Sequence, residues 1–246
     1  MDQDALDVLR SAVERSRRQS TVQLPIDFVR DPAEAPTALK QIGSDGRGQG
    51  LRLKLYLSMT MLATKKPYQL RPYPASAYAM MLALDDPEGQ GARRVNQGQR
   101  WLRDTGFIQR VENGTHPPHI TLLPLQAHGD WGGRWITLPI GLWSNGWIQV
   151  MSGRALMLYV VLRELTGGRP GGATADGRRK RQYGLSDETW ARGTADLEGL
   201  GLAQVSRVID SSDPFSRRQP RLKYRLDDDG MSRLPSAYQA AGVLPA

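Results

Sequence analysis

Two segments of this 246-residue chain match each other when one is shifted along the sequence by 95 positions. The matched pairs are Gly98 with Gly193, Leu102 with Leu197, Gly106 with Gly201, Phe107 with Leu202 and Gln109 with Gln204. The tripeptide Leu24-Pro25-Ile26 also returns as Leu138-Pro139-Ile140, ahead of the first long apolar segment of each half. Each match is weak alone, but their agreement in order favours a tandem repeat. The fold should therefore be one that a unit of about 100 residues can form twice.

The first half is predicted to contain three helices followed by a two-stranded hairpin. The helices are expected at 51–64, 76–84 and 92–105, and the strands at 107–111 and 119–123. Apolar spacing at 51–64 is mixed and leaves a strand open, but leucine and methionine content favours a buried helix. Gly106 fits the left-handed position after a helix, and Asn113-Gly114 fits a hairpin tip. A helix at 2–18, a strand entry at 21–29 and a loop rich in glycine and proline at 31–50 are expected before them.

The second half repeats this order. A strand entry is expected at 135–138, helices at 152–165, 176–183 and 186–200, and paired strands at 203–209 and 221–226. Ser186 is expected to cap the third helix, with Asp187 and Glu188 in its first turn. The chain then divides into an N-terminal helix (1–20), a first unit (21–125), a linker (126–134), a second unit (135–230) and a C-terminal tail (231–246). The expected fold class is α+β, mainly α-helical with short β-hairpins.

The order of these elements resembles that of tandem winged helix-turn-helix DNA-binding proteins. The features that carry the resemblance are Leu-Pro-Ile, a long apolar helix, a basic turn, a capped helix ending Leu-x-x-x-Gly, and a basic hairpin. It covers about residues 21–230 and is one of pattern. Plasmid replication initiators have this two-unit plan, and bacterial transcription regulators have the single unit. The resemblance implies that the third helix and the hairpin of each unit bind duplex DNA, often as a dimer on repeated sites.

The net charge agrees with a polyanionic partner without establishing one. Lys and Arg number 33 against 25 Asp and Glu, which gives +8, and basic surfaces gain affinity for phosphates by releasing counterions. Only six of the 33 are lysine, leaving 27 arginines, so a coding bias toward arginine is the alternative explanation. The distribution of the charges must decide.

The helix at 92–105 has the local residue pattern that most strongly indicates DNA binding. Val95, Gly98, Trp101, Leu102 and Thr105 fall on its inward side. The opposite side carries basic and amide side chains, with a further arginine beside them: Arg93, Arg94, Asn96, Gln97 and Arg100. Arginine can bond both acceptors of guanine, and Asn or Gln can bond both edges of adenine in the major groove. We interpret this side as a base-reading face, the alternative being an ordinary solvated helix face.

The equivalent face of the second unit carries Glu188, Ala191, Arg192 and Ala195, a poor set for reading bases. Positive charge lies around it instead. The predicted DNA-binding residues of this half are Arg178, Arg179, Lys180, Arg181, Arg192, Arg217, Arg218 and Arg221. Such residues suit phosphates, which position a protein but carry little sequence information. We therefore expect base discrimination from the first unit and backbone affinity from the second, although the cluster at 178–181 also suits a solvated helix end.

Four tryptophans, Trp131, Trp135, Trp143 and Trp147, lie between the units. Stacking on single-stranded bases is one use for them. Packing of the junction between the two units is the preferred interpretation.

The sequence contains few residues of the kinds that catalysis and metal binding need. The chain has no cysteine and three histidines, which excludes disulfides, thiolate zinc sites and cysteine nucleophiles. His116 and His119 flank two prolines without a nearby thiolate or carboxylate cluster to complete a metal site. The glycine-rich segment 167–172 lacks the Lys-Ser/Thr ending of a phosphate-binding loop. We expect no enzyme, no metal and no cofactor.

The predicted function is sequence-specific binding of double-stranded DNA, as a transcription regulator or as a replication initiator of a plasmid or mobile element. Formation of a homodimer is possible, and no small-molecule substrate is evident. No signal peptide or membrane-spanning run is expected, which favours a soluble, cytoplasmic protein. The alternative is a protein–protein interaction module built on winged helices, whose binding would depend much less on salt.

Overall fold

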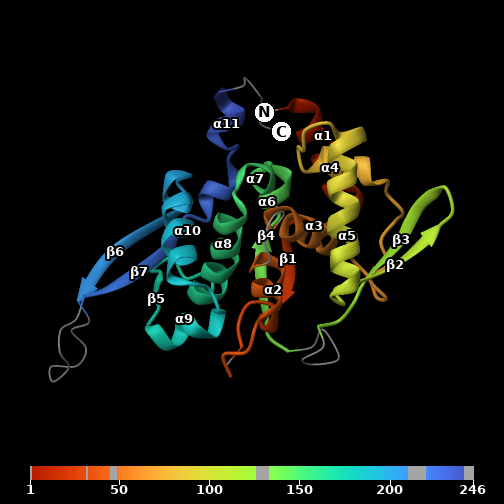
Figure 1. The fold of residues 1–246 in the computed structure, drawn as a ribbon. Helices are drawn as coiled ribbons and strands as arrows, with labels where there is room; N and C mark the ends of the chain where they lie inside the picture. Colours follow the sequence, from red (N-terminus) through yellow and green to blue (C-terminus); the bar gives the residue numbers. More distant parts are fainter. Residues whose placement is uncertain (1, 32, 45–48, 126–132, 210–219, 241–246) are drawn as a thin grey trace.

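A computed structural model describes residues 2–31, 33–44, 49–125, 133–209 and 220–240. Within these residues the chain forms helices and three small antiparallel sheets, so the predicted α+β class is confirmed. Helices α3 and α8 and the strand pair β1–β4 lie in the centre, and two β-hairpins project from opposite ends of the molecule (Figure 1).

The first half follows the predicted order of helices and hairpin closely. Its elements are α1 (Gln3–Ser16), β1 (Thr21–Pro25), α2 (Ala38–Ser44), α3 (Gln49–Leu62), α4 (Ala75–Met81), α5 (Ala92–Asp104), β2 (Ile108–Asn113) and β3 (His116–Leu122). A 3-10 turn, η1 (Ile26–Phe28), follows β1, and a π-helical turn, η2 (Pro87–Gly91), precedes α5. The hairpin strands reach further toward the tip than expected, since β3 includes Pro117 and Pro118.

The loop predicted for residues 31–50 is wrong over Ala38–Ser44, which form α2. Glycine and proline dominate the composition of that stretch, but Leu39 and Ile42 lie one turn apart on one face, and both are fully buried. Burial of this apolar face stabilises a short helix that local composition disfavours.

The second half repeats the helices and the hairpin. Its elements are β4 (Trp135–Pro139), α6 (Gly141–Ser144), α7 (Trp147–Val150), α8 (Gly153–Thr166), β5 (Ala173–Thr174), α9 (Gly177–Tyr183), α10 (Asp187–Gly199), β6 (Ala203–Ile209), β7 (Pro220–Leu226), η3 (Asp229–Ser232) and α11 (Ser236–Ala240). Ser186 caps α10 as predicted, because its Oγ accepts the Thr189 amide at 3.1 Å. Strands β6 and β7 pair as predicted, while the predicted loop between them lies largely outside the described residues.

The residues matched at a shift of 95 occupy equivalent places in the two halves. A Cβ on Gly98 would lie 2.7 Å from Leu55 of α3, and one on Gly193 would lie 3.0 Å from Leu158 of α8. Gly106 and Gly201 both have positive φ, 79° and 71°. In each half a glycine thus allows close packing of two helices, α5 on α3 and α10 on α8. A second glycine ends α5 or α10 before the hairpin.

Each hairpin also gains a third extended segment from the chain ahead of the second helix. In the first half Gln69 bridges Thr121 of β3, and in the second half β5 pairs with β7. The strand order is therefore the same at both ends of the molecule, although β5 is only two residues long.

Strands β1 and β4 join the halves directly. They pair antiparallel with Gln23 opposite Thr137, and these two residues immediately precede the two Leu-Pro-Ile copies. A pairing between equivalent residues places a local two-fold axis through the pair. Helices α3 and α8 meet in the same way, since a Cβ on Gly50 would lie 3.1 Å from the Cα of Gly153. Both glycines stand three residues before a Leu-x-Leu-Tyr sequence, at Leu53 and Leu156.

One continuous hydrophobic cluster fills the centre, with contributions from both halves. Trp143 and Trp147 are buried in it, as expected for packing at the junction. The Trp143 indole N–H donates to Ser58 of α3 at 3.3 Å, and that of Trp147 donates to the Arg233 carbonyl at 2.8 Å. Trp135 is 38% exposed at the start of β4, and Trp131 lies outside the described residues.

Gln149 of α7 binds the second half to the first. Its side-chain amide donates to the carbonyls of Met81 at 2.8 Å and Ala5 at 3.1 Å, and its oxygen accepts from Tyr238. The C-terminal segment predicted as a tail is thereby held in place, because Tyr238 packs with Leu6 and Leu234 in a small cluster of its own.

Lys54 of α3 is a lysine whose charged form is destabilised by burial. Its ammonium donates to the Gln149 carbonyl at 2.9 Å, and burial lowers the pKa of Lys54 from 10.5 to about 8. A lysine whose folded-state pKa is depressed destabilises the folded protein below that pKa. The free energy of unfolding should therefore gain a contribution from Lys54 as the pH rises from about 8 toward about 10.5.

We expect Lys54→Met to raise the free energy of unfolding at neutral pH by about 1–2 kcal/mol, because the cost of burying the charge exceeds the hydrogen bond that is lost. Denaturant unfolding at about pH 7 and about pH 9.5 checks this, and the advantage of the variant should shrink at the higher pH. Lys65→Met, at an exposed lysine, is the control. A Lys54→Met advantage that is absent at neutral pH, or that does not change with pH, would contradict the expectation.

Candidate nucleic-acid interface

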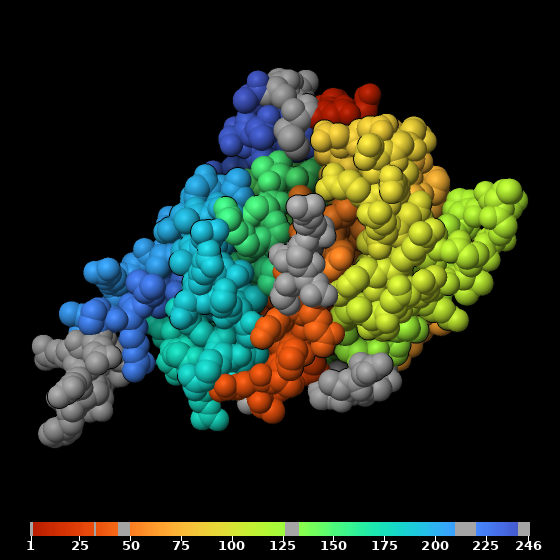
Figure 2. Space-filling model, in the orientation of Figure 1, coloured from red at the N-terminus to blue at the C-terminus, as the bar shows by residue number. Residues whose placement is uncertain are grey.

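Helix α5 buries one side and leaves the predicted base-reading side open. Val95, Gly98 and Leu102 are buried, as the helical period predicts. On this side Arg93, Arg94, Gln97 and Arg100 are exposed, and none of these three arginines has an ion-pair partner among the described residues. The yellow segment that contains α5 lies open on one face of the molecule (Figure 2).

Two residues expected on the inward side of α5 lie nearer the surface. Trp101 is only partly buried and stacks with Phe107, while the Arg52 guanidinium lies 4.4 Å from its ring centroid. Thr105 is exposed, and its hydroxyl donates to the Trp101 carbonyl at 2.7 Å, so it stabilises the end of the helix instead of packing in the core.

Asn96 is half-buried and belongs to a hydrogen-bond network with the hairpin. The Arg110 guanidinium of β2 donates to Asn96 Oδ1 at 3.2 Å and to Gln99 Oε1 at 3.4 Å, and it also pairs with Glu112. This orientation leaves the amide nitrogen of Asn96 for an external partner. Sequence reasoning missed Arg110 and Gln99. The available signal was a charged residue at the inward-facing position of β2, two residues after buried Ile108.

Three arginines converge where α5 meets β2. Burial lowers the pKa of Arg110, and the neighbouring charges of Arg100 and Arg103 lower that pKa further. Two carboxylates lie near them. Glu112 pairs with Arg110, and Asp104 accepts from Arg103 at 2.8 Å, but both acids are mostly exposed. An anion bound here would relieve the mutual repulsion of the three guanidinium groups.

The corresponding face of α10 is different in character. Glu188, Ala191, Arg192 and Ala195 are all exposed, as the matched positions predict. Arg192 forms an ion pair with Glu188 at 2.8 Å, one turn away on the same face. The pair is exposed and weak, but it offsets the one positive charge on this face.

The basic run of α9 is largely engaged within the protein. Arg179 Nη2 lies 2.7 Å from Glu164, Arg181 Nε lies 3.0 Å from Glu34, and the Lys180 ammonium lies 5.0 Å from the Trp190 ring centroid. Arg178 is exposed and has no ion-pair partner among the described residues. Of the other predicted residues, Arg221 is exposed on β7, and Arg217 and Arg218 lie outside the described part of the chain.

Glu164 organises this region. Its side chain is 5% exposed and accepts from Arg30 at 3.1 Å, from Arg179 and from the Tyr183 hydroxyl. The Asp31 amide also donates to the Gln182 carbonyl at 3.0 Å. The segment after β1 of the first half thereby holds α9 of the second half through a buried carboxylate and a backbone hydrogen bond.

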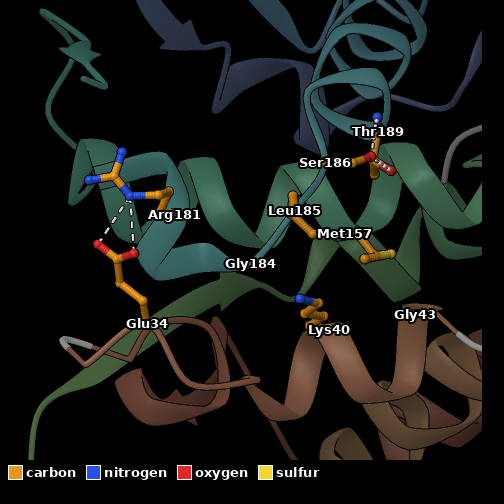
Figure 3. Close-up of a pocket in the computed structure, with 9 residues that line it drawn as sticks. All are labelled: Glu34, Lys40, Gly43, Met157, Arg181, Gly184, Leu185, Ser186 and Thr189. Atoms are coloured by element: carbon orange, nitrogen blue, oxygen red, sulfur yellow. Dashed lines mark hydrogen bonds and ion pairs between the residues drawn. The ribbon is translucent and has the colours of Figure 1, made fainter. Parts of the chain in front are cut away.

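A cleft of about 620 Å³ lies beside this contact (Figure 3). Its lining residues are Glu34, Lys40, Gly43, Met157, Arg181, Gly184, Leu185, Ser186 and Thr189. Lys40 of α2 points toward the turn at Gly184, and the Glu34–Arg181 pair closes one end (Figure 3). The cleft is lined by one carboxylate, two cations and two hydroxyls, and the Ser186 hydroxyl oxygen already accepts the Thr189 amide at 3.1 Å.

No family model, curated protein or solved structure matches the chain. Within the part of the chain that the structure describes, no helix is long and apolar enough to cross a bilayer. Among those same residues, no three histidine, aspartate or glutamate side chains are grouped as metal ligands.

We expect Glu164→Gln to lower the free energy of unfolding by about 2–4 kcal/mol, because two half-buried arginines lose the charge of their buried partner. Glu188→Gln, which removes an exposed acid paired with Arg192, should change it by less than about 0.5 kcal/mol. Denaturant unfolding of both variants measures the difference. Equal midpoints for the two would show that Glu164 does not hold α9 in place.

Proposed function

We propose that this chain is a sequence-specific double-stranded DNA-binding protein in which each half is a winged helix-turn-helix unit. The observation that carries the proposal is the surface formed by α5 and β2, where exposed Arg93, Arg94, Gln97 and Arg100 lie beside converging arginines. A recognition helix must bury one side and present the other to the major groove. The burial pattern of α5 meets this requirement.

The chemistry of α5 suits direct reading of base edges. Arg93 and Arg100 can each bond the O6 and N7 acceptors of guanine, and Gln97 can bond adenine. Asn96 presents its amide nitrogen, since Arg110 occupies its oxygen, so it should donate to an acceptor on a base or a phosphate. The hairpin β2–β3 then lies next to the helix, in the place where a wing meets the adjacent backbone.

The second unit is expected to contribute affinity more than discrimination. Its helix α10 carries two exposed alanines and a paired arginine. Arg178 of α9 and Arg221 of β7 are exposed elsewhere on the same unit. The local two-fold relation at Gln23–Thr137 presents the two units in opposite orientations. One copy of the chain should therefore cover two half-sites in inverted order, one read stringently and the other loosely.

Regulation of transcription and initiation of plasmid or mobile-element replication both need such recognition. A directly repeated site in an origin would favour replication, and a palindrome that overlaps a promoter would favour regulation. One observation favours a second candidate, a protein-interaction module: the exposed face of α10 is nearly neutral. A partner protein on α10 would leave the reading face of α5 available for DNA.

Selection of bound fragments from a random duplex pool tests the proposal and should recover an asymmetric inverted site. We expect Arg93→Ala with Gln97→Ala to weaken binding to the selected duplex by about 10- to 100-fold and to random duplex by much less, because base contacts are lost. Arg178→Ala should weaken both by the same small factor. These effects are measured by equilibrium titration.

Arg15→Ala, at an exposed arginine of α1, controls for the loss of one positive charge. If the Arg93 and Gln97 changes weaken selected and random duplex by equal factors, α5 does not read bases. If no fragment is enriched from the pool, the chain is not a sequence-specific DNA-binding protein.

A further inference from the structure

A basic cleft of about 550 Å³ lies in the second half, away from α5. It is bounded by the loop after α8, by β5 and β7, and by the start of α9. Its lining residues are Leu165, Arg169, Gly172, Ala173, Thr174, Asp176, Arg179, Arg221 and Lys223. Neither Arg169 nor Lys223 was among the residues that the sequence singled out.

A glycine brings the loop tightly against β7. Gly172 has φ 72°, and a Cβ there would lie 2.4 Å from the Tyr224 carbonyl oxygen. The Gly172 amide donates to the Arg169 carbonyl at 3.0 Å, which closes the turn. Arg169 Nε donates to the Thr166 carbonyl at 3.0 Å. The guanidinium is thus held at one nitrogen, and Arg169 lines the cleft.

The sheet adds two further donors on one side. Thr174 of β5 stands directly opposite Lys223 of β7, and directly opposed residues of an antiparallel pair share a face of the sheet. The side chains of Thr174 and Lys223 therefore leave the sheet on the same side, and both line the cleft. Arg221 is two residues away on β7 and lines the same cleft.

The charges of the cleft do not balance. Arg179 is matched by Glu164, outside the cleft lining. Asp176 is the single carboxylate that lines the cleft, and its oxygen already accepts the Arg179 amide at 2.6 Å. Lys223 and Arg169 have no ion-pair partner among the described residues. A rigid guanidinium, an ammonium and a hydroxyl around one hollow match a tetrahedral oxyanion with two negative charges.

We propose that this cleft binds a phosphate group, held by Arg169, Lys223 and Thr174. The group comes either from the DNA backbone, in which case the site rests on the proposed function, or from a free phosphorylated molecule. A backbone phosphate here extends the DNA contact of the second unit to the β5–β7 face of its hairpin.

The test uses the full chain with inorganic phosphate at constant ionic strength, followed through the backbone amide resonances of residues 172–174. The wild type should show saturable shifts, and Arg169→Gln with Lys223→Gln should abolish them. Arg225→Gln is the matched control, because Arg225 is exposed on the same strand but does not line the cleft. The same variants are then titrated with selected and random duplex.

A loss of about 3- to 10-fold in affinity for every duplex, with a salt slope shallower by about one per residue removed, identifies the DNA backbone as the source. Lost phosphate binding with unchanged duplex affinity identifies a free phosphorylated ligand. Phosphate binding by a wild type that binds no duplex supports the site while overturning the proposed function. Absent saturable shifts in the wild type, or shifts that persist in the double variant, overturn the inference.

Discussion

The antiparallel pairing of β1 with β4 is the interaction on which the rest of this structure depends. It joins segments more than 100 residues apart and sets Gln23 against its equivalent, Thr137. The contact of Gly50 with Gly153 repeats the same two-fold relation between α3 and α8. Because the core is continuous across this junction, the two units are held as one body. The distance and orientation between α5 and α10 are consequently fixed by packing, without help from a second copy of the chain.

The distribution of ion pairs separates the arginines that are paired within the protein from those that are not. Arg30 and Arg179 share the buried carboxylate of Glu164, and Arg154 forms two hydrogen bonds with Asp196. On α5, Arg93, Arg94 and Arg100 have no ion-pair partner among the described residues. At the α5–β2 junction the charges of Arg100 and Arg103 act against that of Arg110. A surplus of positive charge alone is weak evidence for DNA binding, since a coding bias produces it too. Its concentration on α5, beside Arg110 of β2, is what supports the proposal.

Local patterns predicted most of the helices and both hairpins. The period of Val95, Gly98 and Leu102 placed the open side of α5, and Ser186 marked the start of α10, because these signals act within one or two turns. The β1–β4 pairing was not predictable in this way, since no local feature of either strand identifies a distant partner. The same holds for Arg179, whose partner Glu164 is the one acidic residue of α8. Helix α2 was missed because glycine and proline hid a short amphipathic segment.

Whether the environment of a candidate site residue could be predicted depends on how far away in the sequence its interaction partner lies. Exposure of Arg93, Gln97 and Arg100 follows from helical geometry and could be foreseen. The pairing of Arg181 with Glu34 depends on the other half of the chain, and that of Arg179 with Glu164 depends on α8, so neither could be foreseen. Arg169 and Lys223 line the same cleft because of a glycine turn and a two-residue strand. Features this short leave no recognisable pattern in the sequence.

The salt dependence of binding to a selected duplex tests the central claim most directly. If phosphates meet the exposed arginines, a plot of log affinity against log salt concentration should fall linearly. About six neutralised phosphates would cost roughly 1000-fold between about 50 and about 200 mM salt. Affinity that stays constant over that range would mean that the arginine-rich surface of α5 and β2 does not meet the backbone of DNA.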